Sequence, residues 1–302
     1  RVGPSCRNLR PIGPRSVMFS IFLFRDSSSF HGSTLIVPEL ISHETERQLC
    51  TYAGDTASRY AEVLPFTRLY RRVCEILGIG TQECLDNGGR VIAMAASARQ
   101  LHSQLKSYAS VETRPEFLTG LVDAVDEFKH CCISADDLMS ASKNAEGVLA
   151  QKLEELSLLL HTYEAICSNG KRDSADQMTW LLDNLENSNY AQEHVFYIDG
   201  FPDYTTQHMA IIEHLISNSP EVIISFNTDS LDSDNPAFEK AGETAGNIIR
   251  YAKRHGIPYR ILKLDEREDL LRPVRKLLFH GTITEQIVLK DVLNVQQFMS
   301  VH

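Results

Sequence analysis

Short apolar runs of strand length lie near both ends of this sequence, separated by segments with helical periodicity. The runs that predict strands are residues 17–24, 33–37, 61–66, 194–199, 221–226 and 259–264. The segments that predict helices between them are residues 43–52, 206–216, 238–255 and 267–279. Strands that are apolar throughout and alternate with helices are typical of a parallel sheet covered by helices. The two ends of the chain therefore predict an α/β fold.

The middle of the chain, residues 66–187, contains no comparable strand pattern. Apolar residues recur there at helical spacing. Pro115 opens one helix, and Ser134 with Asp137 forms an N-cap followed by an acidic first turn. The predicted inner face of the helix after Pro115 consists of Phe117, Leu118, Leu121, Val122, Val125 and Phe128. This stretch predicts an all-helical unit.

The simplest assembly of these parts is one α/β domain with a helical insertion. Residues 1–65 and 188–302 form the sheet domain, and residues 66–187 form the inserted helical subdomain. Two or three N-terminal strands alone cannot cover both faces of a parallel sheet, so we prefer this assembly to three independent modules. It predicts that residues 33–37 and 194–199 share one sheet.

Composition narrows the function classes. The chain has 302 residues, is 43% hydrophobic and carries a formal net charge of −10, which suits one or two domains with a substantial core. No apolar run is long enough to cross a membrane, so we expect a cytoplasmic protein without a membrane partner. The acidic balance excludes a uniformly basic nucleic-acid coat, but it leaves room for a local basic stripe.

The cysteines argue against a metal centre. There are seven, and none has the spacing Cys-x-x-Cys, so the sequence predicts neither a zinc site nor a disulfide framework. The adjacent Cys131 and Cys132 are expected on the inner face of a helix, with a redox role as the alternative.

Asp199 is the first candidate functional residue. It ends the apolar run 194–199, and nucleotide-hydrolysing α/β folds hold magnesium with such an aspartate at the carboxyl edge of the sheet. The next residue in those sites is usually a glutamate that polarises the attacking water, but here it is Gly200. The alternative is a strand-to-loop corner in which Asp199 caps backbone amides.

The phosphate-binding loop that such a fold needs is incomplete. Gly3, Pro4 and Ser5 have the form of its front half, but Asn8 stands where the second glycine of G-x-x-x-x-G-K-[ST] belongs. These three residues remain candidates for nucleotide binding, although the sequence contains no complete loop for ATP.

A group of arginines supplies candidates for nucleic-acid binding. Arg68, Arg71 and Arg72 are spaced i, i+3 and i+4 on the helix after Phe66, opposite its apolar stripe, and Arg47 is near in sequence. Clustered arginines on one helix face can contact phosphates. The alternative is an ordinary solvated helix face.

Several strings of residues, taken together and in order, resemble a known family. They are LIVPE (35–39), TER (45–47), AEVLPFTRL (61–69), EFL (116–118), DEFK (126–129), ISADDL (133–138) and YIDGF (197–201). Their order and spacing resemble the N-terminal helicase-like region of AddB, a subunit of the bacterial AddAB helicase–nuclease that has RexB as a close relative. The resemblance covers about residues 33 to 280, and the residues before Ser33 do not match it.

The resemblance implies a RecA-like domain of the P-loop NTPase and superfamily 1 helicase type, with an inserted helical subdomain. It implies that DNA and an AddA-like motor subunit are the partners, in a heterodimer that processes double-strand ends for recombinational repair. ATP and magnesium are the implied cofactors, with Asp199 at the family's magnesium position. An iron–sulfur cluster is expected only in a C-terminal nuclease region that this chain is too short to include. Thr45 and Arg47 join the three arginines as candidate DNA contacts.

Three functions follow from these observations. We favour a DNA-binding, helicase-like scaffold that scans the emerging strand and is inactive alone. The second is an ATP hydrolase with an unrecognised phosphate loop. The third is a protein-interaction module whose helical insertion docks the motor subunit.

Overall fold

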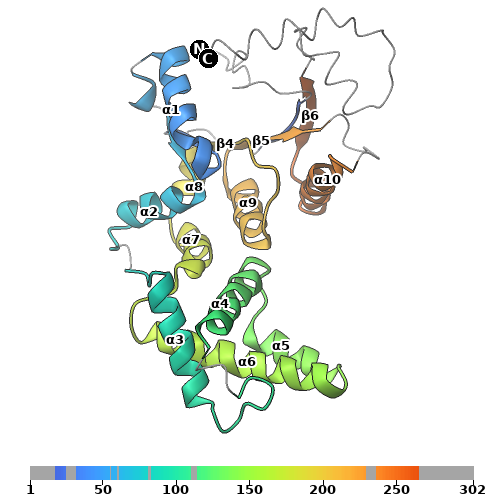
Figure 1. Cartoon of the computed structure of the whole chain (residues 1–302). Helices are drawn as coiled ribbons and strands as arrows, with labels where there is room; N and C mark the ends of the chain where they lie inside the picture. The colour runs from blue at the N-terminus through green and yellow to red at the C-terminus, as the bar shows by residue number, and fades with distance from the viewer. Residues whose placement is uncertain are drawn as a thin grey trace, which may run out of the picture. The chain divides into compact units, whose positions relative to one another are not determined.

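The computed structural model of the chain describes residues 18–24, 32–54, 56–59, 61–80, 83–109, 114–228 and 236–264. These residues form an α/β protein of two compact units, whose elements are labelled in Figure 1. The sheet unit comprises residues up to 65, residues 191–203 and residues from 215 onward. The helical unit comprises residues 66–190 and 204–214. Each unit is therefore built from stretches that are far apart in the sequence.

The sheet unit contains six strands in the order β3-β2-β4-β5-β1-β6. Their bounds are Met18–Phe24 (β1), Gly32–Ile36 (β2), Ala61–Leu64 (β3), His194–Ile198 (β4), Glu221–Asn227 (β5) and Tyr259–Leu264 (β6). β2 pairs in parallel with β3 and β4, and β4 pairs in parallel with β5. Leu35 lies opposite Tyr197. The prediction that the early and late parts of the chain share one sheet is confirmed.

β1 departs from the predicted parallel sheet. It lies between β5 and β6 and runs antiparallel to both, with Met18 opposite Asn227 and Leu264. Only residues 25–31 separate β1 from β2 in the sequence, whereas a parallel crossover needs a dozen or more residues. The short connection suits a reversal of direction, so the expectation of a parallel sheet is wrong for this strand.

The sheet unit buries the apolar runs that predicted its strands. β4 buries Val195, Phe196 and Ile198, and β5 buries Val222, Ile224 and Phe226. The helices and the 3-10 turn of this part are α1 (Glu39–Ala53), η1 (Ala57–Arg59), α10 (Glu239–Arg254) and the end of α9 (Thr206–Asn218). α10 packs near β5 and buries Ala245, Ile248 and Ala252 on one face. Continuous apolar strands thus sit under amphipathic helices, as the pattern predicted.

The helical unit contains α2 (Phe66–Ile76), α3 (Asn87–Gln100), α4 (Pro115–His130), α5 (Ala135–Lys143), α6 (Gly147–Ser168), η3 (Ser174–Asp176) and α7 (Gln177–Glu186), and the short α8 (Tyr190–Glu193) leads into β4. Its core joins α3, α4, α5 and α6. The Ser134 hydroxyl accepts from the Asp137 amide at 3.2 Å, and the Asp137 carboxylate accepts from the Ser134 amide at 2.9 Å. This capping box confirms the predicted start of α5.

Two details of the helical prediction are wrong. Phe117 was expected on the inner face of α4, but its side chain is 48% exposed and lies against Tyr108. Cys131 and Cys132 were expected to face inward, but both follow the end of α4 and are exposed. The buried face of α4 follows residues 118, 121, 122, 125 and 129, and Phe117 lies off that stripe. The predicted helix 267–279 lies outside the described residues.

None of the helices that the structure describes is both long enough and apolar enough to cross a membrane.

Candidate functional site

The three predicted arginines lie on the side of α2 that its core residues leave uncovered. The residues that α2 buries are Phe66, Leu69, Tyr70, Val73 and Cys74. Arg71 is exposed, and Arg68 and Arg72 are half-buried. Arg72 pairs at 3.6 Å with Glu75, the one acidic residue in this helix. The outer side of α2 therefore carries three guanidinium groups and a single carboxylate of its own.

Positive charge is concentrated in the first turn of α2. That turn contains Arg68 and no acidic residue, whereas α5 begins with Asp136 and Asp137 and α4 begins with Glu116. The free N–H groups and the dipole at a helix N-terminus already favour anions. Because an arginine adds to this field instead of cancelling it, this end of α2 suits a phosphate group.

His208 of α9 holds the start of α2 in place. Its ring stacks on that of Phe66, with a centroid distance of 4.5 Å and an interplanar angle of 23°. Its backbone N–H donates to the Thr205 hydroxyl at 3.2 Å. Burial, and to a lesser extent His130, lowers the pKa of His208 from 6.5 to about 4. The neutral ring is thus the form that packs against α2.

Acidification should destabilise the helical unit through His208. Between pH 6.5 and 4 the unfolded chain binds a proton that the folded ring resists, so stability present above pH 6.5 is lost as the pH falls through 4. The shift corresponds to at most about 3 kcal/mol. Urea midpoints at pH 7 and pH 4.5 measure this loss, and His208→Gln should reduce it while the exposed His161→Gln should not. An equal loss in both variants would contradict the assignment.

Asp199 directly follows β4 at the carboxyl edge of the parallel strands. Its N–H donates to the Ile36 carbonyl of β2 at 3.0 Å. Its carboxylate accepts a hydrogen bond from the Ser225 hydroxyl of the neighbouring β5. The two flanking strands therefore fix both the backbone and the side chain of Asp199. One carboxylate in this position can contribute one ligand to a magnesium ion that is otherwise held by phosphates and water.

The loop after Asp199 departs from a hydrolytic site. Gly200 has φ of 82°, a conformation that a glutamate adopts only with strain. Further along the loop, Asp203 pairs with Lys240 of α10 at 2.6 Å, and both side chains are exposed. Among the described residues no group of three or more His, Cys, Asp or Glu side chains is placed to bind a metal ion. A metal at Asp199 would thus depend on a bound nucleotide.

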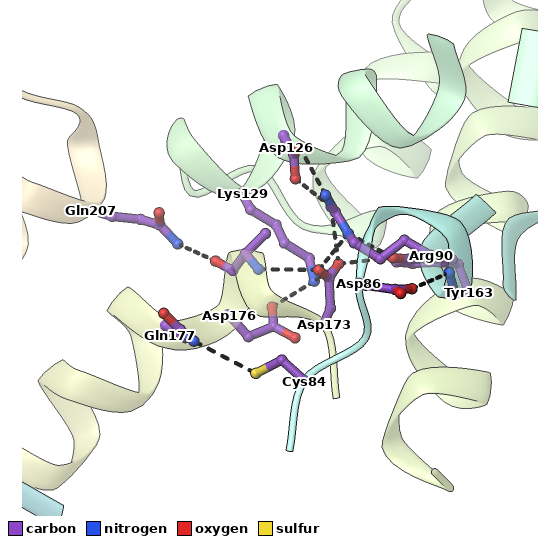
Figure 2. Close-up of polar contacts among 12 residues, drawn as sticks. Cys84, Asp86, Arg90, Asp126, Lys129, Tyr163, Asp173, Asp176, Gln177 and Gln207 are labelled. Carbon is purple, nitrogen blue, oxygen red and sulfur yellow. Dashed lines mark hydrogen bonds and ion pairs between the residues drawn. The ribbon is translucent and has the colours of Figure 1, made fainter. Parts of the chain in front are cut away.

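A buried ionic network crosses the helical unit (Figure 2). Asp173, just before η3, is fully buried. Its carboxylate contacts Nε of Arg90 at 2.8 Å and Nζ of Lys129 at 3.0 Å, and it accepts from the Tyr163 hydroxyl at 3.0 Å. Burial opposes its ionisation, but the charge of Lys129 and a hydrogen bond from Ala175 hold the pKa of Asp173 below its usual value. Asp173 thus joins α3, α4 and α6.

Two further carboxylates complete the network. Asp126 accepts a paired hydrogen bond from the Arg90 guanidinium, and Asp176 contacts Nζ of Lys129 at 2.5 Å. Burial opposes the charge of Lys129, but Asp176 and Asp173 together raise its pKa. With two cations and three carboxylates that satisfy one another, this arrangement fixes the packing of helices and leaves little capacity for a ligand.

Residues 25–275 match the protein family described as "ADDB, N-terminal". The chain belongs to the AddB N-terminal family. It is 26% identical over 234 residues to the ATP-dependent helicase/deoxyribonuclease B subunit of Clostridium tetani, which covers 74% of this chain and 20% of that protein. The protein of the same name from Acetivibrio thermocellus is 28% identical over 238 residues, covering 77% and 21%. The one from Thermoanaerobacter sp. is 25% identical over 286 residues, covering 90% and 24%.

This AddB N-terminal chain therefore spans about a fifth to a quarter of the length of these relatives. The resemblance predicted from the ordered strings is confirmed, and the matched range, 25–275, is close to the predicted 33–280.

The candidate DNA contacts of the AddB N-terminal chain fall in different parts of the structure. Thr45 is 5% exposed on α1, so its hydroxyl has no open path to a phosphate, and we correct that expectation. Arg47 is exposed, but both Nε and a terminal nitrogen donate to Glu44 at 2.9 Å. That hydrogen bond is the main reason why the pKa of Glu44 is lowered to about 2. The arginines of α2 remain the best placed.

The candidate phosphate-loop residues Gly3, Pro4 and Ser5 lie outside the described residues. Within the described part, β2 leads through Val37 and Pro38 into α1, and β3 leads through Pro65 into α2. Neither connection has the glycines of a phosphate loop. β1 cannot supply the loop from its end, because Phe24 pairs with Glu221 at the amino edge of β5.

Sequence reasoning missed Ser225 and the buried network. Ser225 is a hydroxyl within the apolar run 221–226, and a polar residue in a buried strand is the signal that could have found it. Lys129 follows Val125 by four residues, so helical spacing places it on the inner face of α4. A buried lysine needs an acidic partner, but sequence alone does not identify Asp173 as that partner.

Proposed function

We propose that this AddB N-terminal chain is a DNA-binding, helicase-like scaffold of a complex that processes double-strand DNA ends in recombinational repair. The observation that carries the proposal is the outer side of α2, with Arg68 in a first turn that contains no acidic residue and Arg71 and Arg72 behind it. The family and the names of its relatives support the setting. Phosphate contacts position a nucleic acid without reading its bases, which is the task of a scaffold.

A scaffold role fits the sheet unit better than a motor role. The parallel strands and the position of Asp199 support a RecA-like ancestry. Gly200, with its positive φ, stands where a hydrolase needs a glutamate. We therefore assign the ATP-driven motor to an AddA-like subunit in a cytoplasmic heterodimer. The nuclease and its iron–sulfur cluster belong to a C-terminal region of the relatives' kind.

Fluorescence anisotropy with labelled single-stranded DNA tests the proposal. Binding should be measurable at low salt and should collapse between about 50 and 200 mM salt, since each phosphate contact releases roughly 0.7 counterions. The absence of binding at low salt would contradict the proposal for this chain.

A second candidate function is nucleotide binding at the carboxyl edge, favoured by the way Ile36 and Ser225 hold Asp199. We expect magnesium–ATP to leave the melting temperature unchanged, because no phosphate loop leaves the described strands. A ligand at 100 times its dissociation constant would add about 2.7 kcal/mol of stability. A stabilisation of that size that is lost in Asp199→Asn would contradict our expectation and favour this candidate.

A further inference from the structure

Cys131 and Cys132 form an exposed pair of adjacent thiols at the end of α4. Both are free and both are exposed. The backbone N–H groups of Cys131 and Cys132 donate to the carbonyls of Glu127 and Lys129, each at 3.0 Å. The next N–H, from Ile133, donates to Phe128 at 2.7 Å. These bonds tie the turn to the last residues of α4, so the two thiols project from a fixed backbone.

The backbone conformations of the two residues differ. Cys131 is close to helical, with φ of −88° and ψ of 0°, whereas Cys132 has φ of 57°. Glycine or asparagine usually occupies this left-handed position at the end of a helix. Cys131 and Cys132 are the only adjacent cysteines in the sequence. Of the described cysteines, Cys74 and Cys167 are buried and Cys50 and Cys84 are half-buried. The pair is thus the most accessible sulfur site in the described part of the chain.

We propose that Cys131 and Cys132 are a vicinal dithiol site that captures monosubstituted trivalent arsenicals. Soft thiolate ligands favour soft, thiophilic acceptors of this kind. Such an arsenical carries one carbon substituent and has two valences left for sulfur, which matches two thiols. Inorganic arsenite has three valences, and the described residues include no group of three ligating side chains around the pair. The site should therefore prefer the organic form.

The reaction needs no oxidant. The arsenical R–As=O and two thiols give R–As(S-Cys)₂ and water. Two S–H bonds and the As=O bond break, two As–S bonds form, and both protons leave with the oxygen. Arsenic stays trivalent throughout. Burial of the Cys132 sulfur, together with the neighbouring Cys131, raises the pKa of the Cys132 thiol. A protonated pair reacts slowly with reagents that need a single thiolate, but here the thiol protons are consumed in forming water.

The test uses phenylarsine oxide and intact-protein mass spectrometry. We expect one arsenical per chain, which survives a wash with a monothiol and is removed by 2,3-dimercaptopropanol. Cys131→Ser and Cys132→Ser should each lose the monothiol-resistant adduct, because one thiol remains. Cys50→Ser is the matched control and should keep it. Arsenite at the same concentration should be removed by the monothiol wash.

A melting experiment separates this site from a bridge between distant cysteines. Adjacent thiols stay adjacent when the chain unfolds, so the unfolded state also binds the arsenical and the melting temperature should hardly change. A bridge between cysteines far apart in the sequence would restrict the unfolded chain and raise the melting temperature. A clear rise, or a monothiol-resistant adduct in both serine variants, would overturn the proposal.

Discussion

Asp173→Ala is expected to lower the free energy of unfolding of the helical unit by about 3–5 kcal/mol, because removing one partner leaves buried charges uncompensated. Asp173 is fully buried, and it is the shared partner of Arg90 and Lys129. Lys129 would keep Asp176, and Arg90 would keep Asp126, but neither carboxylate reaches both cations. Denaturant titration followed by circular dichroism measures the loss.

The matched control removes a carboxylate from an exposed pair. Glu83 contacts Lys171 at 2.9 Å, with side chains that are 80% and 60% exposed. Glu83→Ala should change stability little, since solvent screens exposed pairs. If Asp173→Ala does not fold, Asp173→Asn keeps the shape of the side chain and should give a smaller, measurable loss. Equal stability of Asp173→Asn and the unmodified protein would contradict the role assigned to the network.

Replacing Arg68, Arg71 and Arg72 together with alanine is expected to weaken binding to single-stranded DNA by about 100-fold at 0.1 M salt. Each phosphate contact contributes roughly 0.7 to the exponent of the salt dependence, so three contacts give about two powers of ten between 1 M and 0.1 M salt. The substituted side chains lie on the outer side of α2, away from its buried residues, so the fold should survive. Anisotropy titration measures the change.

A variant of equal charge separates local contact from net charge. Arg99, Lys143 and Lys152 are exposed residues of α3, α5 and α6 in the same helical unit. Replacing these three with alanine removes the same three charges, and it should weaken binding much less. A similar loss in both triple variants would mean that overall charge, and not the face of α2, governs binding.

Most of the fold could be predicted from the sequence because its signals are local. The apolar runs at 194–199 and 221–226 became β4 and β5, and Ser134 capped α5 as its spacing indicated. The shared sheet followed from a physical constraint, since the early strands alone could not bury both faces. The direction of β1 could not be read from its residues, because an apolar strand has the same pattern whichever way it runs.

The candidate site was predicted less completely, because its geometry depends on long-range partners. Helical spacing placed Arg68, Arg71 and Arg72 on one side of α2, as found. The same reasoning gave no indication that Thr45 is buried. It also did not pair Asp199 with Ser225, which is 26 residues away and adjacent only through strand register. Contacts of this kind are set by the order of strands in the sheet.

The most direct test of the DNA-binding proposal is the salt dependence of binding for three proteins: the unmodified chain, the α2 triple variant and the triple variant of Arg99, Lys143 and Lys152. The slope of log affinity against log salt counts phosphate contacts. We predict that it becomes shallower by about 2 in the α2 variant and is unchanged in the other. Equal slopes in all three proteins would contradict the assignment of α2 as the DNA-contacting face.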